Sequence, residues 1–309
     1  MSEGSILGMS DERMSEETTI DAPAVRARRV RPEGWTPPGP QPRGADGRAD
    51  LVPGPEEDLS FLSGDFRIFQ HKRGHRWSLD DFVTAAVAIE AVQARSLAVE
   101  RAADIGCGIG SVMMMVAWAF PEARVSGVEA QALSASLARR SLAWNGIDDR
   151  CVVESGDLRD PATLAGRGPF DLVTGTPPYI ALGAGLVSEK VQRGPCCFET
   201  RGGIEEYAVA AARLLRPGGV FVACAGASPE TRTEDAARAA GLVPSLRVDV
   251  VPREGKAVLF RVVVADKPTL GREGFAPAMS QRSFTVRDRA TGLTSDMRGA
   301  RALLGLPPI

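Results

Sequence analysis

Histidine, tyrosine and lysine are rare in this 309-residue chain, which contains two, two and four of them. The two histidines, His71 and His75, have Gly74 between them, and the chain has no third histidine to complete a set of metal ligands. It also has no Cys-x-x-Cys pair. A protein metal site needs three or four such ligands at suitable spacing, so we expect no bound metal.

Long apolar runs and a disulfide framework are also absent. The run at residues 112–120 is far shorter than the roughly 20 residues that span a bilayer, and the N-terminus has no basic-then-apolar signal pattern. The cysteines are odd in number, and two of them are adjacent: Cys107, Cys151, Cys196, Cys197 and Cys224. We therefore expect reduced thiols in a soluble, cytoplasmic protein that does not enter a membrane.

The charge is nearly balanced, with 37 basic and 39 acidic residues, which excludes a histone-like polycation. The first sixty residues differ from the rest because they hold eight of the 22 prolines and 12 acidic against seven basic side chains, with Trp35 as their single aromatic residue. Such a segment buries too little apolar surface to offset its conformational entropy. We expect residues 1–60 to form a disordered, acidic, proline-rich tail and residues 61–309 to form one folded domain.

From about residue 80, short apolar runs alternate with helical patterns, which is typical of right-handed crossovers around a parallel sheet. The predicted strands cover residues 101–105, 123–129, 151–154, 170–174, 219–225, 245–251 and 257–264. The last two flank residues 252–255, a turn that indicates an antiparallel hairpin. The pattern predicts a Rossmann-like α/β fold, in which a seven-stranded, mostly parallel sheet ends in this C-terminal hairpin and carries helices on both faces.

A glycine-rich motif lies where the first predicted strand turns into a helix. It reads Asp104-Ile105-Gly106-Cys107-Gly108-Ile109-Gly110. Glycines let the backbone approach a ligand at the carboxyl edge of a sheet, but a dinucleotide site would have its third glycine one residue later. This combination of a carboxylate with glycines resembles the S-adenosylmethionine loop of class I methyltransferases. The resemblance implies that Asp104, Gly106, Cys107, Gly108 and Gly110 bind the cofactor.

Acidic residues also end the next two predicted strands. Glu129 follows Asp104 by 25 residues, and Asp157-Leu158 follows the third strand. A carboxylate at the position of Glu129 can accept hydrogen bonds from both ribose hydroxyls. In the family that this pattern resembles, an acid at the position of Asp157 contacts the adenine amine. We expect Glu129, Asp157 and Leu158 to complete the cofactor site.

The sequence Thr176-Pro177-Pro178-Tyr179 follows the fourth predicted strand. It resembles the (Asn/Asp/Ser)-Pro-Pro-(Tyr/Phe) signature of methyltransferases that act on amine nitrogens conjugated to a ring or a carbonyl group. In such an enzyme a side-chain oxygen and a proline carbonyl accept the two amine hydrogens, and the aromatic residue stacks on the planar substrate. We expect all four residues to be catalytic, with Thr176 in the place of the usual, longer asparagine.

Residues 69–80 resemble one particular family among the class I methyltransferases. They read Phe-Gln-His-Lys-Arg-Gly-His-Arg-Trp-Ser-Leu-Asp and are similar to an element of the bacterial tRNA(Val) adenine-N6-methyltransferases. Residues 284–294 resemble the end of the same family, so the resemblance covers about residues 61–309. It implies that Lys72 and Asp80 assist cofactor binding and that the enzyme methylates the N6 amine of an adenine next to the anticodon of a tRNA.

Two regions carry basic side chains that could neutralise RNA phosphates. One is the loop 180–202, with Lys190, Arg193 and Arg201, and the other is residues 265–309, with seven basic residues. Two alternatives stay open. A protein glutamine N-methyltransferase would use the same Pro-Pro-Tyr chemistry on a planar amide, and a cofactor-binding protein with weakened or lost catalysis would explain Thr176. The sequence does not indicate the oligomeric state.

Overall fold

The computed structural model describes residues 32–179, 199, 202–269 and 278–308. The chain divides into two units, Met1–Trp35 and Thr36–Ile309, and all helices and strands of the described residues lie in the second unit. Most of the first unit, residues 1–31, lies outside the described residues, and so does that part of the expected disordered tail.

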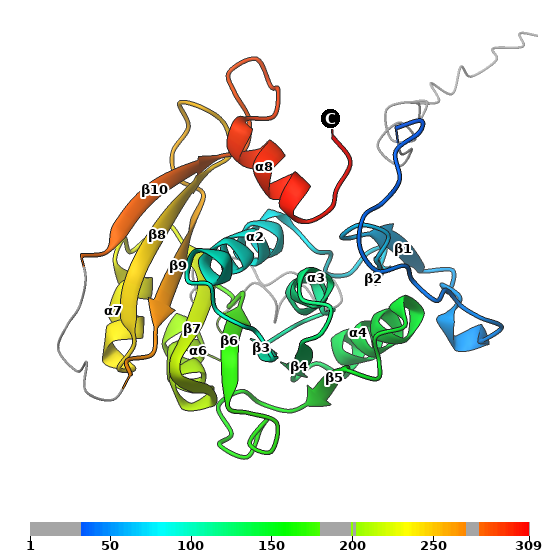
Figure 1. Cartoon of the computed structure of the whole chain (residues 1–309), viewed down its shortest axis with the longest axis horizontal. Coiled ribbons are helices and arrows are strands. Elements are labelled where there is room, and N and C mark those ends of the chain that lie inside the picture. Colours follow the sequence, from blue (N-terminus) through cyan, green and yellow to red (C-terminus); the bar gives the residue numbers. More distant parts are fainter. Residues whose placement is uncertain (1–31, 180–198, 200–201, 270–277, 309) are drawn as a thin grey trace, which may run out of the picture. The chain divides into compact units, whose positions relative to one another are not determined.

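An eight-stranded sheet forms the centre of the second unit (Figure 1). Across the sheet the strands are β5 (Cys151–Ser155), β4 (Arg124–Glu129), β3 (Arg101–Ile105), β6 (Phe170–Gly175), β7 (Leu215–Gly226), β9 (Phe260–Asp266), β8 (Val243–Val251) and β10 (Ser280–Thr285). Only β9 runs against its neighbours, as the predicted hairpin requires. The seven predicted strands are therefore confirmed, and β10 adds an eighth strand, parallel to β8.

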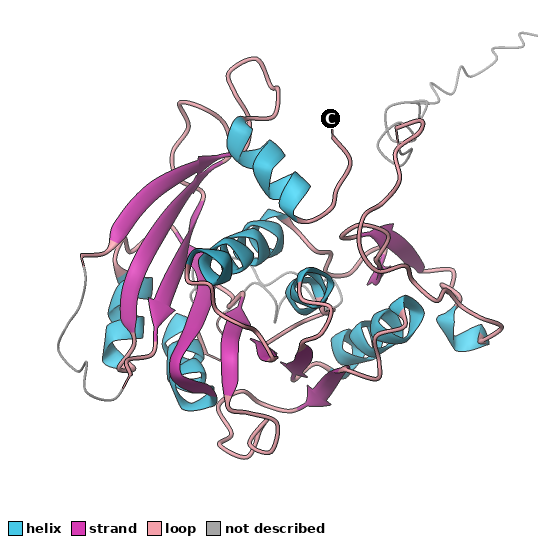
Figure 2. Ribbon diagram, viewed as in Figure 1, coloured by secondary structure: helices cyan, strands magenta, loops and turns pink. Residues whose placement is uncertain are grey.

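Helices cover both faces of the sheet, as predicted (Figure 2). On one face α2 (Leu79–Ala94), α3 (Ser111–Ala119), α4 (Ala132–Asn145) and α8 (Ser295–Leu303) share a core with the strands. On the other face α6 (Ile204–Leu214) and α7 (Arg232–Ala239) pack over a second core. No helix of the described part of the chain is long and apolar enough to cross a membrane.

The strand register brings the loops after β3, β4, β5 and β6 to one edge of the sheet. Ile105, the last residue of β3, pairs with Val128 of β4 and with Gly175 at the end of β6. Glu129, at the end of β4, pairs with Ser155 at the end of β5. Residues up to 70 positions apart in sequence therefore meet at the carboxyl edge, where ligands bind in folds of this type.

The start of the folded unit differs from the expected boundary after residue 60. A short helix, η1 (Ala49–Leu51), and a hairpin of β1 (Glu57–Phe61) and β2 (Arg67–His71) precede α2. Leu51 is 1 % exposed, and Arg140 of α4 donates hydrogen bonds to the carbonyls of Asp50 and Val52. These tertiary contacts, together with an ion pair between Arg140 and Glu57, dock the segment, and a proline-rich composition does not indicate them.

Candidate active site

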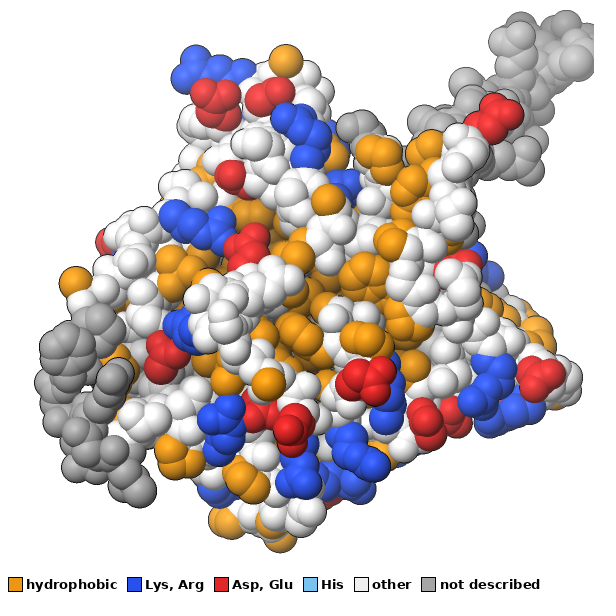
Figure 3. All heavy atoms as spheres, viewed as in Figure 1, with side chains coloured by type: hydrophobic (Ala, Val, Ile, Leu, Met, Phe, Trp, Pro, Cys, Tyr) orange, Lys and Arg blue, Asp and Glu red, His pale blue; other side chains and the backbone are white. Residues whose placement is uncertain are grey.

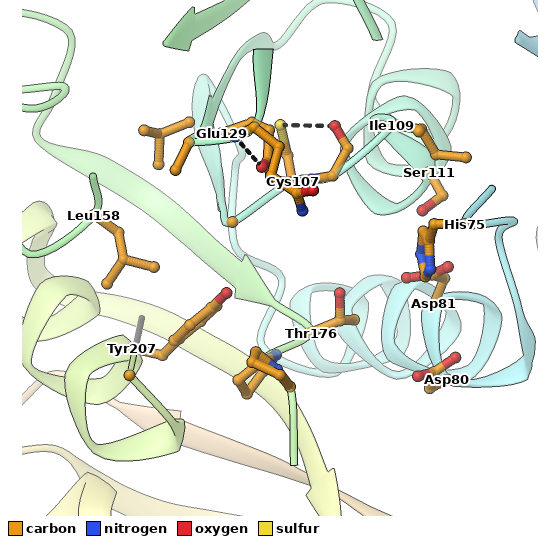
Figure 4. Close-up of a pocket in the computed structure, with 18 of the residues that line it drawn as sticks. His75, Asp80, Asp81, Cys107, Ile109, Ser111, Glu129, Leu158, Thr176 and Tyr207 are labelled. Carbon is orange, nitrogen blue, oxygen red and sulfur yellow. Dashed lines mark hydrogen bonds between the residues drawn. The ribbon is translucent and has the colours of Figure 1, made fainter. Parts of the chain in front are cut away.

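A cavity of about 470 Å³ lies at the carboxyl edge of the parallel strands. Its walls come from the loops after β3, β4, β5 and β6, from the segment before α2 and from α6 (Figure 4). Eleven of the residues expected to form the site line this cavity: Asp80, Gly106, Cys107, Gly108, Glu129, Asp157, Leu158, Thr176, Pro177, Pro178 and Tyr179. A volume in this range is typical of cofactor sites.

Glu129 is fixed by two backbone donors. The Gly108 N–H donates to its Oε2 at 2.9 Å, and the Gln131 N–H donates to its Oε1 at 2.6 Å. Gly108 has a φ of +55°, a left-handed conformation that favours glycine, and a Cβ added there would meet no atom within 4 Å. The carboxylate is thus held at the cavity wall, and the glycine loop leaves open space beside it.

Asp104 does not line the cavity, although the sequence predicted that it binds the cofactor. It is 2 % exposed, and its carboxylate accepts hydrogen bonds from the Thr174 hydroxyl at 2.9 Å and from the Met113 N–H at 3.1 Å. Burial raises its pKa to about 7. Asp104 therefore ties the first turn of α3 to β6 behind the glycine loop, which is a structural role.

Two adjacent carboxylates at the start of α2 line the cavity. The sequence indicated Asp80 but not Asp81, which is 4 % exposed and accepts a hydrogen bond from the Ser78 N–H at 3.0 Å. This contact is part of a capping box that begins the helix. Burial, followed by the charge of Asp80, raises the pKa of Asp81 to about 8. The Ser78-x-x-Asp81 spacing is the signal by which the sequence could have identified it.

The Thr176–Tyr179 segment forms another part of the cavity wall. Thr176 is half-buried, and Figure 4 shows its side chain projecting into the cavity. Pro177 is buried, whereas Tyr179 is 40 % exposed. A Cβ added to Gly226 would lie 3.4 Å from the Tyr179 ring, so the ring rests beside the end of β7. The segment therefore combines an inward hydroxyl with an accessible aromatic ring.

Lys72 and Gly110 also fall outside the cavity lining. The Lys72 ammonium donates to the Pro55 carbonyl at 2.5 Å, beside the β1–β2 hairpin. Gly110 begins α3 with a φ of +86°, and a Cβ there would lie 3.2 Å from the Ala138 side chain, so it is needed for close packing. Besides Asp81, six polar residues that the sequence did not indicate line the cavity: His75, Arg76, Ser78, Ser111, Gln131 and Tyr207.

The residues at the cavity fit the S-adenosylmethionine that the resemblance implies. Glu129 can accept from ribose hydroxyls, and the open space at Gly108 admits a ligand close to the backbone. Three carboxylates that line the cavity complement a ligand that carries a sulfonium and an ammonium group: Asp80, Glu129 and Asp157. Asp81, with a pKa raised to about 8, adds little negative charge at neutral pH. Among the described residues, no three histidine, cysteine or carboxylate side chains are grouped so that they could hold a metal ion.

Of the ten basic residues expected to meet RNA, the structure describes six, and each of these has a partner within the protein. Lys190, Arg193, Arg201 and Arg272 lie outside the described residues. The other six basic residues at positions 265–309 all have intramolecular partners: Lys267, Arg282, Arg287, Arg289, Arg298 and Arg301. On the face shown in Figure 3, acidic and basic side chains of the described residues are interspersed rather than gathered into one basic patch.

Comparisons with known proteins agree with this site. The model of the methyltransferase small domain family matches residues 81–225. The chain is 36 % identical over 118 residues to a tRNA1(Val) (adenine(37)-N6)-methyltransferase of Porphyromonas gingivalis, which covers 38 % of this chain and 46 % of that protein. It is 34 % identical over 128 residues to a release factor glutamine methyltransferase of Chlorobaculum tepidum, covering 38 % and 42 %. The chain thus matches less than half the length of these relatives.

A solved structure supports the fold separately from these sequence comparisons. A crystal structure of a predicted O-methyltransferase from Agrobacterium tumefaciens superposes with a TM-score of 0.52 at 19 % identity, covering 75 % of this chain and 99 % of that one. This likeness shows the Rossmann-like methyltransferase fold, and the family match includes the glycine loop, Glu129 and the Thr176–Tyr179 segment. The resemblance to class I methyltransferases is therefore confirmed, and residues 81–225 of this chain match the model of the methyltransferase small domain family.

Proposed function

We propose that this protein is an S-adenosylmethionine-dependent N-methyltransferase that methylates the exocyclic N6 amine of an adenine in RNA, with a tRNA in the cytoplasm as substrate. One observation carries the proposal. Two sets of residues line one cavity: the Thr176–Tyr179 segment, which resembles the substrate motif of such enzymes, and residues 106–109 with Glu129, which resemble their cofactor motifs. The bound cofactor would supply an electrophilic methyl group.

The residues of this chain would hold and orient the amine. Its nitrogen is a weak nucleophile because its lone pair is delocalised into the purine ring. The Thr176 hydroxyl and the Pro177 carbonyl would accept its two hydrogens and leave the lone pair directed at the methyl group. Tyr179, which is 40 % exposed, would stack on an adenine that has been flipped out of its helix. The proton released after transfer would pass to solvent.

The similarity to an adenine-N6-methyltransferase supports the choice of an adenine. A second candidate substrate is the side-chain amide of a glutamine in a protein, because the chain is similar to a release factor glutamine methyltransferase at nearly the same level. Both substrates present a planar, conjugated nitrogen. They differ in the surroundings of that nitrogen, since an adenine offers a ring large enough to cover the Tyr179 face.

The two substrates can be separated by one labelling experiment. The purified protein is incubated with S-adenosylmethionine labelled in the methyl group and with total RNA or total protein from a strain that lacks the gene. We expect label in the tRNA fraction, recovered as N6-methyladenosine after digestion to nucleosides. Label confined to protein glutamine would replace the proposal with its second candidate, and cofactor binding without transfer to either fraction would indicate lost catalysis.

A further inference from the structure

Tyr207 lies in the first turn of α6, and the methyl transfer proposed above gives it no role. It is 6 % exposed and lines the cavity. Figure 4 shows its side chain extending from α6 toward the cavity, between Leu158 and Thr176. Two glycines make room for it: a Cβ on Gly106 would lie 2.1 Å from the Tyr207 hydroxyl oxygen, and a Cβ on Gly175 would lie 2.7 Å from its ring.

One of these glycines lies on the cofactor side of the site and the other on the substrate side. Gly106 opens the loop that follows β3, which would hold the cofactor, and Gly175 immediately precedes Thr176. The residue before Gly106, Ile105, pairs with Gly175 in the sheet. One side chain, borne by a helix that packs on this face of the sheet, therefore contacts both strand ends where the methyl donor and the methyl acceptor must meet.

We propose that Tyr207 is a positioning residue that sets the separation between the glycine loop and the Thr176–Tyr179 segment. This inference rests on the proposed methyltransferase function. In-line transfer requires the methyl carbon and the amine nitrogen at near-attack distance, and a displacement of about 1 Å can lower the rate about 100-fold. A rigid aromatic ring that fills the contact with both loops limits such displacement, whereas a smaller side chain would let the two loops shift.

The central test compares Tyr207→Leu with Tyr207→Phe. Leucine keeps an apolar group but not the ring, and phenylalanine keeps the ring without the hydroxyl. Leu214→Ala is the matched control because Leu214 is in the same helix and the same core, is 7 % exposed, and does not line the cavity. The measurements are the single-turnover rate at saturating cofactor and tRNA, and the Kd for S-adenosylhomocysteine.

We expect Tyr207→Leu to lower the single-turnover rate at least tenfold while the Kd changes less than threefold. Tyr207→Phe should recover most of the rate, and Leu214→Ala should keep it while lowering the melting temperature. A native rate in Tyr207→Leu would overturn the proposal. So would an equal loss of rate in Leu214→Ala, because the effect would then be general destabilisation of α6.

A second readout needs no turnover. The chain has two tyrosines, Tyr179 and Tyr207, and both line the cavity, so labelling with 3-fluorotyrosine gives two ¹⁹F resonances. Their assignment follows from the resonance that disappears in Tyr207→Phe. Saturating S-adenosylhomocysteine should shift the Tyr207 resonance, and an unmoved resonance would overturn the placement of Tyr207 beside the donor loop. An inactive native protein in which this resonance still shifts would contradict the proposed function but not this placement.

Discussion

The Gly108 N–H donates a hydrogen bond of 2.9 Å to the Glu129 carboxylate, which joins the loop after β3 to the end of β4. The same carboxylate accepts from the Gln131 N–H through its other oxygen. With both oxygens held by the backbone, Glu129 presents a fixed acceptor at the cavity wall. A ligand with two adjacent hydroxyls can bind such an acceptor with little loss of side-chain entropy.

Replacing Glu129 by alanine should weaken cofactor binding. The variant loses a charged acceptor for ribose hydroxyls, which corresponds to roughly 2–3 kcal/mol or about a 30- to 150-fold rise in Kd. Isothermal titration calorimetry with S-adenosylmethionine measures this change. Glu122→Ala is the control because Glu122 is an exposed acid that does not line the cavity. Equal affinities in both variants would exclude Glu129 from the binding site.

Asp81 should make the ligand-free protein less stable as the pH rises. Burial raises its pKa to about 8 in the folded state, from 3.8. Between about pH 4 and pH 8 the native state therefore binds more protons than the unfolded state, so the free energy of unfolding falls with increasing pH. Asp104, whose pKa is raised to about 7, acts in the same direction.

Asp81→Asn removes the first of these two contributions and can still accept the hydrogen bond from the Ser78 N–H. Its stability relative to the native protein should therefore increase steadily from pH 4 to pH 8 in urea unfolding. The exposed Asp160→Asn serves as a control that does not line the cavity. Native and Asp81→Asn curves that run parallel over this range would show that Asp81 does not titrate as described.

The N-terminal segment should contribute to stability through Leu51. Leu51 is 1 % exposed, so Leu51→Ala leaves an unfilled space and should lower the free energy of unfolding by about 2–4 kcal/mol. The neighbouring Val52 is 57 % exposed, and Val52→Ala should change it by less than about 0.5 kcal/mol. Chemical denaturation of both variants tests this pair, and equal effects would mean that the segment does not dock through Leu51.

The sequence predicted the parts of the fold that have strong local signals. Gly106 and Gly108 mark the turn after β3, and Gly146, with a φ of +72°, ends α4 directly after Asn145, a pattern typical of helix ends. β10 was missed because its residues 280–285 are mostly polar and alternate weakly, as an edge strand permits. The docking of residues 49–57 was not predicted because it depends on tertiary contacts with Arg140, which is more than 80 positions away in the sequence.

Residues of the candidate site could be predicted from the sequence only where they belong to a recognisable motif. Glu129 is the last residue of β4 and Thr176 directly follows β6, and both line the cavity. Asp104 stands in the motif but points behind the loop, a direction that depends on the packing of α3 and not on sequence spacing. Tyr207 was not identified because it lies on a helix of ordinary pattern, and only tertiary packing brings it against Gly106 and Gly175.

The most direct test is the single-turnover rate of methyl transfer to unmodified tRNA by Thr176→Val, measured as N6-methyladenosine by nucleoside mass spectrometry. Valine has nearly the shape of threonine but cannot accept a hydrogen bond, so the rate should fall about ten- to a hundredfold, which corresponds to roughly 1–3 kcal/mol. Thr176→Ser keeps the hydroxyl and should retain most of the native rate. A native rate in Thr176→Val would contradict the account, because the Thr176 hydroxyl would then not hold the amine.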